Sequence, residues 1–238
     1  MNTPLEPREC LSCSTQFQPA DCYQYECESC ETQRKANEER RKLEKNQTAI
    51  REQIEAATPH RFTLTDVAHA QFNAKAWARI QTWRPTAEKP WLGLVGATGT
   101  CKTRMARLAG GEWLLRKTTS GRIPTFEFVT SFEISEKIMA QFNETGSDKG
   151  DARGFLDRLR RVDLLLIDGL GKGRLTPAPA AELFALVDHR HAHNLITIWT
   201  ANSTPEEIIA NMNKDVSEDM KAPLAGRLNE CSQVFILK

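Results

Sequence analysis

Residues 96–103 have the sequence GATGTCKT and lie between the apolar run 91–96 and a helical pattern. In this context the pattern GxxxxGK[ST] is typical of a turn whose backbone N–H groups surround phosphate oxygens at a helix N-terminus. Lys102 is expected to reach the β- and γ-phosphates, and the Thr103 hydroxyl to bind Mg²⁺. The motif therefore predicts a P-loop for ATP formed by Gly96, Ala97, Thr98, Gly99, Thr100, Cys101, Lys102 and Thr103.

One position departs from this pattern. Cys101 stands where a glycine is expected before the lysine. A Cβ at this position crowds a place where backbone approaches phosphate closely. The substitution therefore puts the strength of nucleotide binding in question, while the surrounding motif still predicts the site.

Five short apolar runs punctuate the chain from Thr58 onward, and longer helical patterns separate them. Apolar strands that alternate with helices predict a parallel sheet with helices on both faces, an α/β fold. The strands are expected at 91–96, 124–130, 163–168, 195–201 and 232–238.

Two polar residues end strands of this sheet. Asp168 follows four apolar residues, the arrangement of a Walker B strand, and is expected beside the P-loop as part of the Mg²⁺ site. Asn202 follows the fourth strand. It either contacts the γ-phosphate or orients water in the site, or it caps the helix that begins near Pro205, and the residues alone do not decide between the site role and the cap role.

Two CxxC pairs lie near the N-terminus, Cys10 with Cys13 and Cys27 with Cys30. Two such turns supply the four thiolates that Zn²⁺ binds as a tetrahedron. We therefore predict a zinc-binding module over residues 1–30, with Cys22 as a fifth candidate ligand. The module has one base and five acids, a formal charge of −4, so we expect it to dock a protein or to be structural rather than to read DNA.

Residues 31–57 are dense in charge and lack Gly and Pro, and opposite charges recur at helical spacing, as in Glu38 and Lys42. This pattern predicts a solvated connecting helix, with a partner-binding helix as the alternative. The net charge of the whole chain is only +1. No apolar stretch is long enough to cross a membrane and no secretory signal begins the chain, so we expect a cytoplasmic protein with reduced cysteines.

Residues 58–238 resemble the AAA+ ATPases of the DnaC/IstB family, the bacterial helicase loaders and transposition helper proteins. GATGTCKT resembles the family's GxxGTGKT, and DHRHAHNLITIWTAN (188–202) resembles its helix, strand and sensor segment. TPHRFTL (58–64) resembles the segment that lies near the adenine pocket, and FVTSFEISEKI (128–138) resembles the second strand and its helix. IDGLG resembles IDDLG, so Gly169 stands where hydrolytic relatives have an acid.

The resemblance implies a three-layer αβα AAA+ core with strand order 5-1-4-3-2, without a C-terminal lid. It implies that Asn202 is a sensor and that Arg227 is the arginine finger that a neighbouring subunit inserts toward the γ-phosphate. A surface arginine is the plain alternative for Arg227, and Arg190 is a second candidate for the finger. The implied catalytic set is Lys102, Asp168, Asn202 and Arg227.

The resemblance also implies binding of single-stranded DNA across the ATPase face. Basic side chains that could line such a groove, or belong to a scattered solvated surface, are Arg153, Arg158, Arg160, Arg161, Lys172 and Arg174.

The motifs predict ATP binding, and the resemblance implies a loader-like protein that binds a replicative helicase and single-stranded DNA and associates with copies of itself. Because of Cys101 and Gly169, we expect at most weak ATPase activity. The alternatives are a helper ATPase for a transposase and a non-hydrolysing, nucleotide-dependent scaffold.

Overall fold

The computed structural model describes residues 5–63, 71–143, 147–172, 176–212 and 214–237. Its contacts divide the chain into two compact units. The first comprises the residues up to Ala49 together with Thr118–Ile123, and the second comprises Ile50–Lys117 and Pro124–Lys238.

The first unit begins with a small hairpin. Strands β1 (Arg8–Glu9) and β2 (Gln16–Phe17) pair antiparallel, with Arg8 opposite Phe17. The charged segment then forms helix α1 (Glu28–Ala57), whose residues up to Ala49 belong to this unit.

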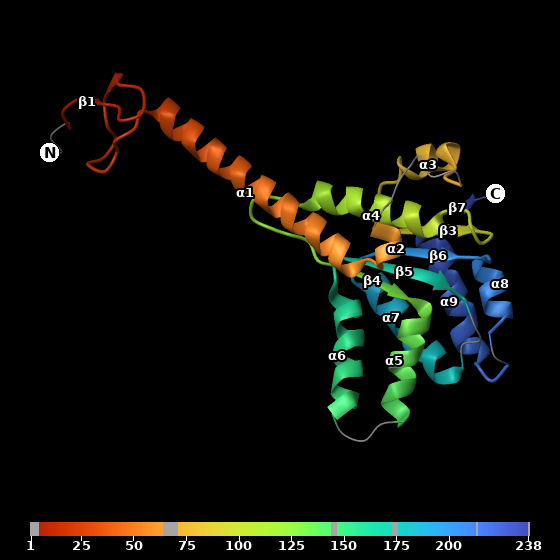
Figure 1. Ribbon diagram of the computed structural model, residues 1–238. Coiled ribbons are helices and arrows are strands. Elements are labelled where there is room, and N and C mark those ends of the chain that lie inside the picture. Colours follow the sequence, from red (N-terminus) through yellow and green to blue (C-terminus); the bar gives the residue numbers. More distant parts are fainter. Residues whose placement is uncertain (1–4, 64–70, 144–146, 173–175, 213, 238) are drawn as a thin grey trace. The chain divides into compact units, whose positions relative to one another are not determined.

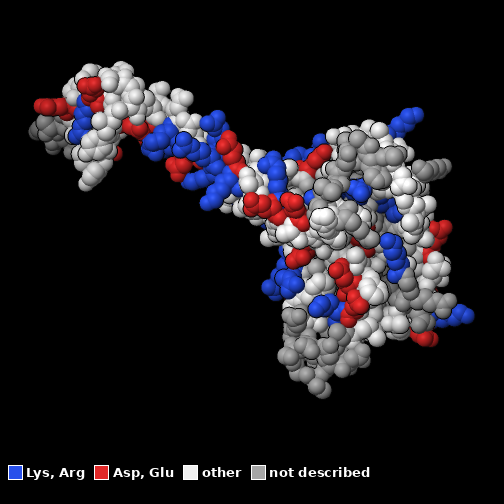
Figure 2. Space-filling view, in the orientation of Figure 1, with Lys and Arg blue, Asp and Glu red and all other residues white. Residues whose placement is uncertain are grey.

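Opposite charges one helical turn apart stabilise α1 locally. Glu31 pairs with Lys35 at 2.6 Å, and Glu38 pairs with Lys42 at 2.7 Å. Figure 2 shows acidic and basic side chains interspersed along this helix. Such exposed pairs contribute about 0.3–0.5 kcal/mol each, which supports a solvated helix as the sequence predicts.

The second unit is built on a five-stranded parallel sheet with the order β4-β5-β6-β3-β7 (Figure 1). In chain order this is 5-1-4-3-2, so the predicted order is confirmed. Because all five strands are parallel, their carboxyl ends lie along one edge of the sheet. The strands are β3 (Trp91–Gly96), β4 (Phe126–Thr130), β5 (Leu164–Leu170), β6 (Ile196–Ala201) and β7 (Ser232–Leu237).

Helices cover both faces of this sheet and complete the predicted three layers. Alternate residues of β3 enter different cores: Leu92 and Leu94 join one, and Trp91 and Val95 join the other. The first core includes Ile50 and Ile54 of α1 and side chains of α3 (Ala74–Ile80) and α4 (Lys102–Lys117). The second includes side chains of α5 (Ser131–Asn143), α6 (Ser147–Arg161), α7 (Pro177–Ala192), α8 (Pro205–Ala210) and α9 (Glu218–Glu230).

A short helix, α2 (His60–Thr63), follows α1. Within the described ranges, no helix is both long enough and apolar enough to cross a membrane.

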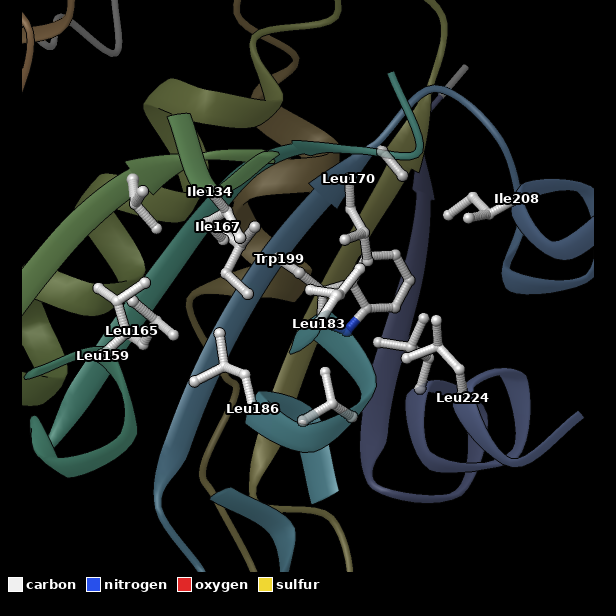
Figure 3. Close-up of a cluster of buried hydrophobic side chains, with 14 of the residues drawn as sticks. Ile134, Leu159, Leu165, Ile167, Leu170, Leu183, Leu186, Trp199, Ile208 and Leu224 are labelled. Atoms are coloured by element: carbon white, nitrogen blue, oxygen red, sulfur yellow. The ribbon is translucent and has the colours of Figure 1, made fainter. Parts of the chain in front are cut away.

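Trp199 of β6 fills the centre of the second core. Its ring is fully buried, and its Nε1 donates a hydrogen bond to Ser232 Oγ at 2.9 Å. Figure 3 shows the ring among Leu170, Leu183 and Leu224. The ring fits because its neighbour in register on β3 is Gly93, where a Cβ would lie 2.7 Å from Trp199 Cε2.

We expect Gly93→Ala to lower the free energy of unfolding by about 1–3 kcal/mol, because the added methyl group overpacks the core against Trp199. Denaturant unfolding measures this change. Gly154→Ala on α6 is the matched control, since a Cβ there meets nothing within 4 Å. A helix gains about 0.5–1 kcal/mol from this replacement, so the two variants should change stability in opposite directions. Equal effects would contradict the role assigned to Gly93.

Candidate functional site

A pocket of about 380 Å³ lies at the carboxyl edge of the sheet, where β3, β5 and β6 end. The P-loop forms one side of it, between β3 and α4. Several separate segments of the second unit contribute to its wall. The described residues that line it are Phe62, Gln71, Thr98, Gly99, Cys101, Lys102, Thr103, Arg104, Asp168, Lys172, Thr200 and Asn202.

Two glycines shape the P-loop. Gly99 has φ +90°, a conformation that residues with a side chain rarely adopt. Gly96 ends β3 so close to β7 that a Cβ there would collide with the carbonyl oxygen of Leu237. The loop therefore needs glycine for backbone conformation at one position and for strand packing at the other.

Cys101 adopts the left-handed conformation that suits glycine. Its φ is +58°, and its carbonyl oxygen accepts the hydrogen bond from Met105 N at 3.0 Å that starts α4. A non-glycine residue pays roughly 1–2 kcal/mol to adopt this conformation. The departure from the motif is thus accommodated as local backbone strain.

Lys102 is folded back onto the loop that it follows. Its side chain is buried, and Nζ donates to the carbonyl oxygens of Gly96 and Ala97, each at 2.7 Å. Burial lowers the pKa of Lys102, the nearby charge of Lys172 lowers it further, and Asp168 opposes both effects. The ammonium group is thus held in the pocket by neutral carbonyls, which an anionic ligand can replace.

Asp168 connects three elements at the base of the pocket. Its Oδ1 accepts a hydrogen bond from Thr103 Oγ1 of α4 at 2.5 Å and from Thr200 Oγ1 of β6 at 2.7 Å. Thr200 Oγ1 in turn accepts from Gly169 N at 3.0 Å. The predicted pair, Thr103 and Asp168, therefore lies together, and Thr200 is an additional member that the sequence analysis did not single out.

Gly169 interrupts the regular ladder of β5. Its φ is +72°, and the register of β5 with β6 shifts between Ile167 and Leu170. The Gly169 carbonyl oxygen accepts hydrogen bonds from Ser131 Oγ at 2.6 Å and from Lys172 N at 3.0 Å. Hydrogen bonds thus hold both the N–H and the carbonyl group of Gly169, in a backbone conformation that residues with a side chain rarely adopt.

Asn202 lines the pocket beside the P-loop. Its Nδ2 donates to Thr98 Oγ1 at 3.4 Å. The cap of the following helix is a different residue: Thr204 and Glu207 form a capping box at the start of α8. Of the two roles left open by the sequence, the helix-cap role is therefore wrong, and the side chain faces the pocket instead.

The two arginines considered for the finger have different surroundings. Arg190 is wrong as a candidate because it is buried and donates to the carbonyl oxygens of Leu159, Val162 and Ile196 and to Thr197 Oγ1. Burial lowers its pKa to about 9. It joins the end of α6 to the start of β6.

Arg227 is partly exposed on α9 and forms an ion pair with Asp188 of α7, with Nε and Oδ1 3.4 Å apart. It is not among the described residues that line the pocket of its own chain.

The basic residues considered for single-stranded DNA do not form one group. Arg158 and Arg160 form ion pairs with acids, Arg158 with Glu127 at 3.7 Å and Arg160 with Glu182 at 3.0 Å. Arg161 ends α6 just before β5 begins, at the amino edge of the sheet, whereas Lys172 follows β5 at the carboxyl edge. Arg153 is exposed on α6, and Arg174 lies outside the described residues.

The four cysteines of the two CxxC pairs come together in the first unit. The sulfurs of Cys10, Cys13, Cys27 and Cys30 all lie within 4.8 Å of one another, and those of Cys13 and Cys27 are 3.7 Å apart. A tetrahedral zinc–thiolate centre with Zn–S bonds of about 2.3 Å has sulfur–sulfur edges of about 3.8 Å, so the cluster is compatible with zinc. Cys22 is exposed and is not part of this group.

The four thiols of this cluster do not titrate alike. Hydrogen bonds with the thiols of Cys13 and Cys27 raise the pKa of Cys30, whereas backbone hydrogen bonding favours the thiolate form of Cys10. Cys27 N donates to Cys10 Sγ at 3.3 Å, and this bond is the main reason why the pKa of Cys10 falls to about 6. A thiolate is the form that binds a metal.

Four further residues line the pocket without having been predicted for the nucleotide site: Gln71, Arg104, Lys172, which was considered only for DNA, and Thr200. Only Thr200 had a usable signal, as a hydroxyl residue at the end of a strand adjacent to the Asp168 strand. Phe62 belongs to the segment that the family resemblance placed near the adenine pocket, and it does line the pocket.

Solved structures of similar fold include DnaI, with a TM-score of 0.60 and 16% identity, over 76% of this chain and 95% of that one. They also include the DnaC helicase loader, with a TM-score of 0.54 and 14% identity, over 76% of this chain and 100% of that one.

A third is AMPPCP-bound DnaA from Aquifex aeolicus, with a TM-score of 0.50 and 16% identity, over 69% of this chain. This chain spans only 45% of that DnaA chain. At such identities the likeness establishes the fold alone.

No curated protein matches the chain in sequence. A family model does match: that of the IstB-like ATP binding proteins, over residues 31–228. The match includes the P-loop, the Asp168 strand and most of the sheet. With its AAA+ fold and the pocket described above, the chain belongs to the family of IstB-like ATP-binding proteins.

Proposed function

We propose that this chain is a loader-type protein in which bound ATP and Mg²⁺ promote association with copies of itself, with a replicative helicase and with single-stranded DNA. The observation that best supports a nucleotide site is that Lys102, Thr103 and Asp168 line one pocket, with Thr103 Oγ1 and Asp168 Oδ1 2.5 Å apart. The likeness in fold to the DnaC helicase loader supports the choice of partner.

The oxygen ligands at the base of the pocket fit Mg²⁺, which prefers carboxylate and hydroxyl oxygens together with phosphate oxygens. Thr103 Oγ1 and Asp168 Oδ1 would hold the ion. When bound, Mg²⁺ neutralises phosphate charge. Lys102 binds and orients the phosphates, and the P-loop N–H groups at the start of α4 supply further donors.

We propose that hydrolysis of ATP to ADP and phosphate is slow. Asp168 is the single carboxylate among the described residues of the pocket wall. Its Oδ1 already accepts two hydrogen bonds from Thr103 and Thr200. Gly169, the next residue, has no side chain that could orient water. ATP would thus act mainly as a switch of binding state.

Arg227 is proposed to complete the site of a neighbouring copy. It is not among the described residues that line the pocket of its own chain, and its partly exposed side chain pairs with Asp188. A cation supplied in trans stabilises charge on the transferring phosphoryl group. Assembly would therefore be required for turnover but not for nucleotide binding.

A helper ATPase for a transposase is the second candidate, and the match to the IstB-like family favours it. The same pocket serves both candidates, so the partner distinguishes them. A scaffold that binds nucleotide without hydrolysis is the third, favoured by Gly169 and the strained Cys101.

Lys102→Ala should weaken binding of a slowly hydrolysed ATP analogue by roughly 10- to 100-fold, because it removes hydrogen bonds between charged groups in a partly desolvated site. Titration calorimetry measures the affinity. Lys117→Ala is the matched control, since Lys117 ends the helix that Lys102 begins. Unchanged affinity in Lys102→Ala would refute the assignment of this pocket.

Arg227→Ala should leave ATP affinity unchanged and abolish phosphate release in the presence of DNA and partner. Asp188→Asn is its control, because it breaks the same ion pair but keeps the arginine. Exposed pairs contribute about 0–1 kcal/mol, so both variants should fold. If both lose turnover equally, the arginine acts only through that pair; if Arg227→Ala keeps normal turnover, the finger assignment fails.

Zinc removal should separate partner capture from nucleotide binding. Tagged protein, loaded with zinc and an ATP analogue, is mixed with lysate of its source cell, beside Cys27→Ser/Cys30→Ser and the control Cys22→Ser. The double variant should lose zinc and partner but keep ATP affinity, and Cys22→Ser should keep all three. Recovery of a replicative helicase supports the loader. Recovery of a transposase favours the helper, and recovery of neither favours the scaffold.

A further inference from the structure

Lys172 is brought over the ATP pocket by a tight turn at the end of β5. Gly169 and Gly171 both have positive φ, +72° and +77°. Lys172 N donates to the Gly169 carbonyl oxygen at 3.0 Å and closes the turn. Gly171 packs against Ile208 of α8, where a Cβ would lie 2.7 Å from Ile208 Cγ1. The turn is thus fixed by two glycines and by packing, and it directs the lysine back toward Asp168.

The Lys172 side chain fills the space that a side chain at position 169 would take. A Cβ built on Gly169 would lie 2.7 Å from Lys172 Cδ and 3.0 Å from Nζ. The ammonium group therefore stands beside the residue that follows Asp168, and Lys172 lines the pocket together with Lys102 and Thr103.

This placement changes the charge of the pocket. The charged residues of its described wall are three cations, Lys102, Arg104 and Lys172, and one anion, Asp168. Their formal sum is +2, and MgATP carries about −2 near neutral pH. Burial first, and Lys172 second, lower the pKa of Lys102 and so disfavour its charged form. An anion between the two lysines relieves this repulsion, so the pocket gains more from a ligand with more terminal charge.

We propose that Lys172 is a second phosphate ligand, which contacts the terminal phosphate of ATP and sets the preference of the site for ATP over ADP. The proposal rests on the proposed function, because it assigns a specificity residue to the same nucleotide site. Lys102 holds the phosphates from the P-loop side, and Lys172 meets the terminal one from the end of β5. The exposed ammonium group of Lys172 is on a flexible side chain, so it can reach the γ-phosphate of ATP. ADP has no γ-phosphate, so this contact is lost.

The test compares the affinities of a slowly hydrolysed ATP analogue and of ADP, each with Mg²⁺, in the full chain. Lys172→Gln should weaken the triphosphate by about tenfold, the loss expected for one charge-assisted hydrogen bond, and ADP by much less. Lys172→Arg should retain most of the preference, since the cation remains. Lys117→Gln removes the same charge at the far end of α4 and should leave both affinities unchanged.

The other outcomes separate the role of Lys172 from the nucleotide site itself. Equal loss of both nucleotides in Lys172→Gln means that the lysine acts through general charge, and no loss means that it does not touch the ligand; either result overturns the proposal. If the unaltered chain binds both nucleotides and Lys102→Ala weakens their binding by the roughly 10- to 100-fold expected above, the nucleotide site of the proposed function stands whatever Lys172 does. If the unaltered chain binds neither nucleotide, the proposed function fails, and this inference fails with it.

Discussion

The carboxylate of Asp168 connects three elements of the second unit beside the nucleotide pocket. One oxygen accepts hydrogen bonds from Thr103 at the start of α4 and from Thr200 at the end of β6. These are three separate elements, and the side chain is buried. A buried polar group is tolerated only when its hydrogen-bond partners satisfy it, so the positions of α4, β5 and β6 at this edge depend on one another. The P-loop is therefore positioned by the same group that is proposed to bind Mg²⁺.

Glycines in β3 and after Asp168 allow close approaches in the core and at this edge of the sheet. Gly93 leaves room for the Trp199 ring in the core, and Gly96 leaves room for β7 beside the P-loop. Gly169 and Gly171 turn the chain after Asp168. Cys101 is the exception, a residue with a side chain in a conformation that favours glycine. Strain of this kind is commonly found at functional sites, where the surrounding structure maintains it.

Most of the fold could be predicted from the sequence because apolar runs and helical patterns alternate strongly from Trp91 onward. The strands lie within two residues of their predicted ends, and the family resemblance supplied the strand order. The site was predictable where a motif fixes spacing, as at Lys102, Thr103 and Asp168. The position of Lys172 could not be predicted, because it depends on a turn with two left-handed glycines. The burial of Arg190 could not be predicted either, because it depends on tertiary contacts with backbone carbonyls, which leave no periodic pattern in the sequence.

The ion pair between Arg227 and Asp188 bears on how copies of the chain would associate. In the proposed assembly, the guanidinium must leave Asp188 before it can face a nucleotide on a neighbouring copy. On association, Arg227 would exchange the carboxylate of Asp188 for the phosphate of a nucleotide, so the number of its ion pairs would not increase. Dissolved salt screens both the pair that is lost and the contact that is gained. This exchange should make the contribution of Arg227 to assembly less sensitive to ionic strength than that of an unpaired surface arginine.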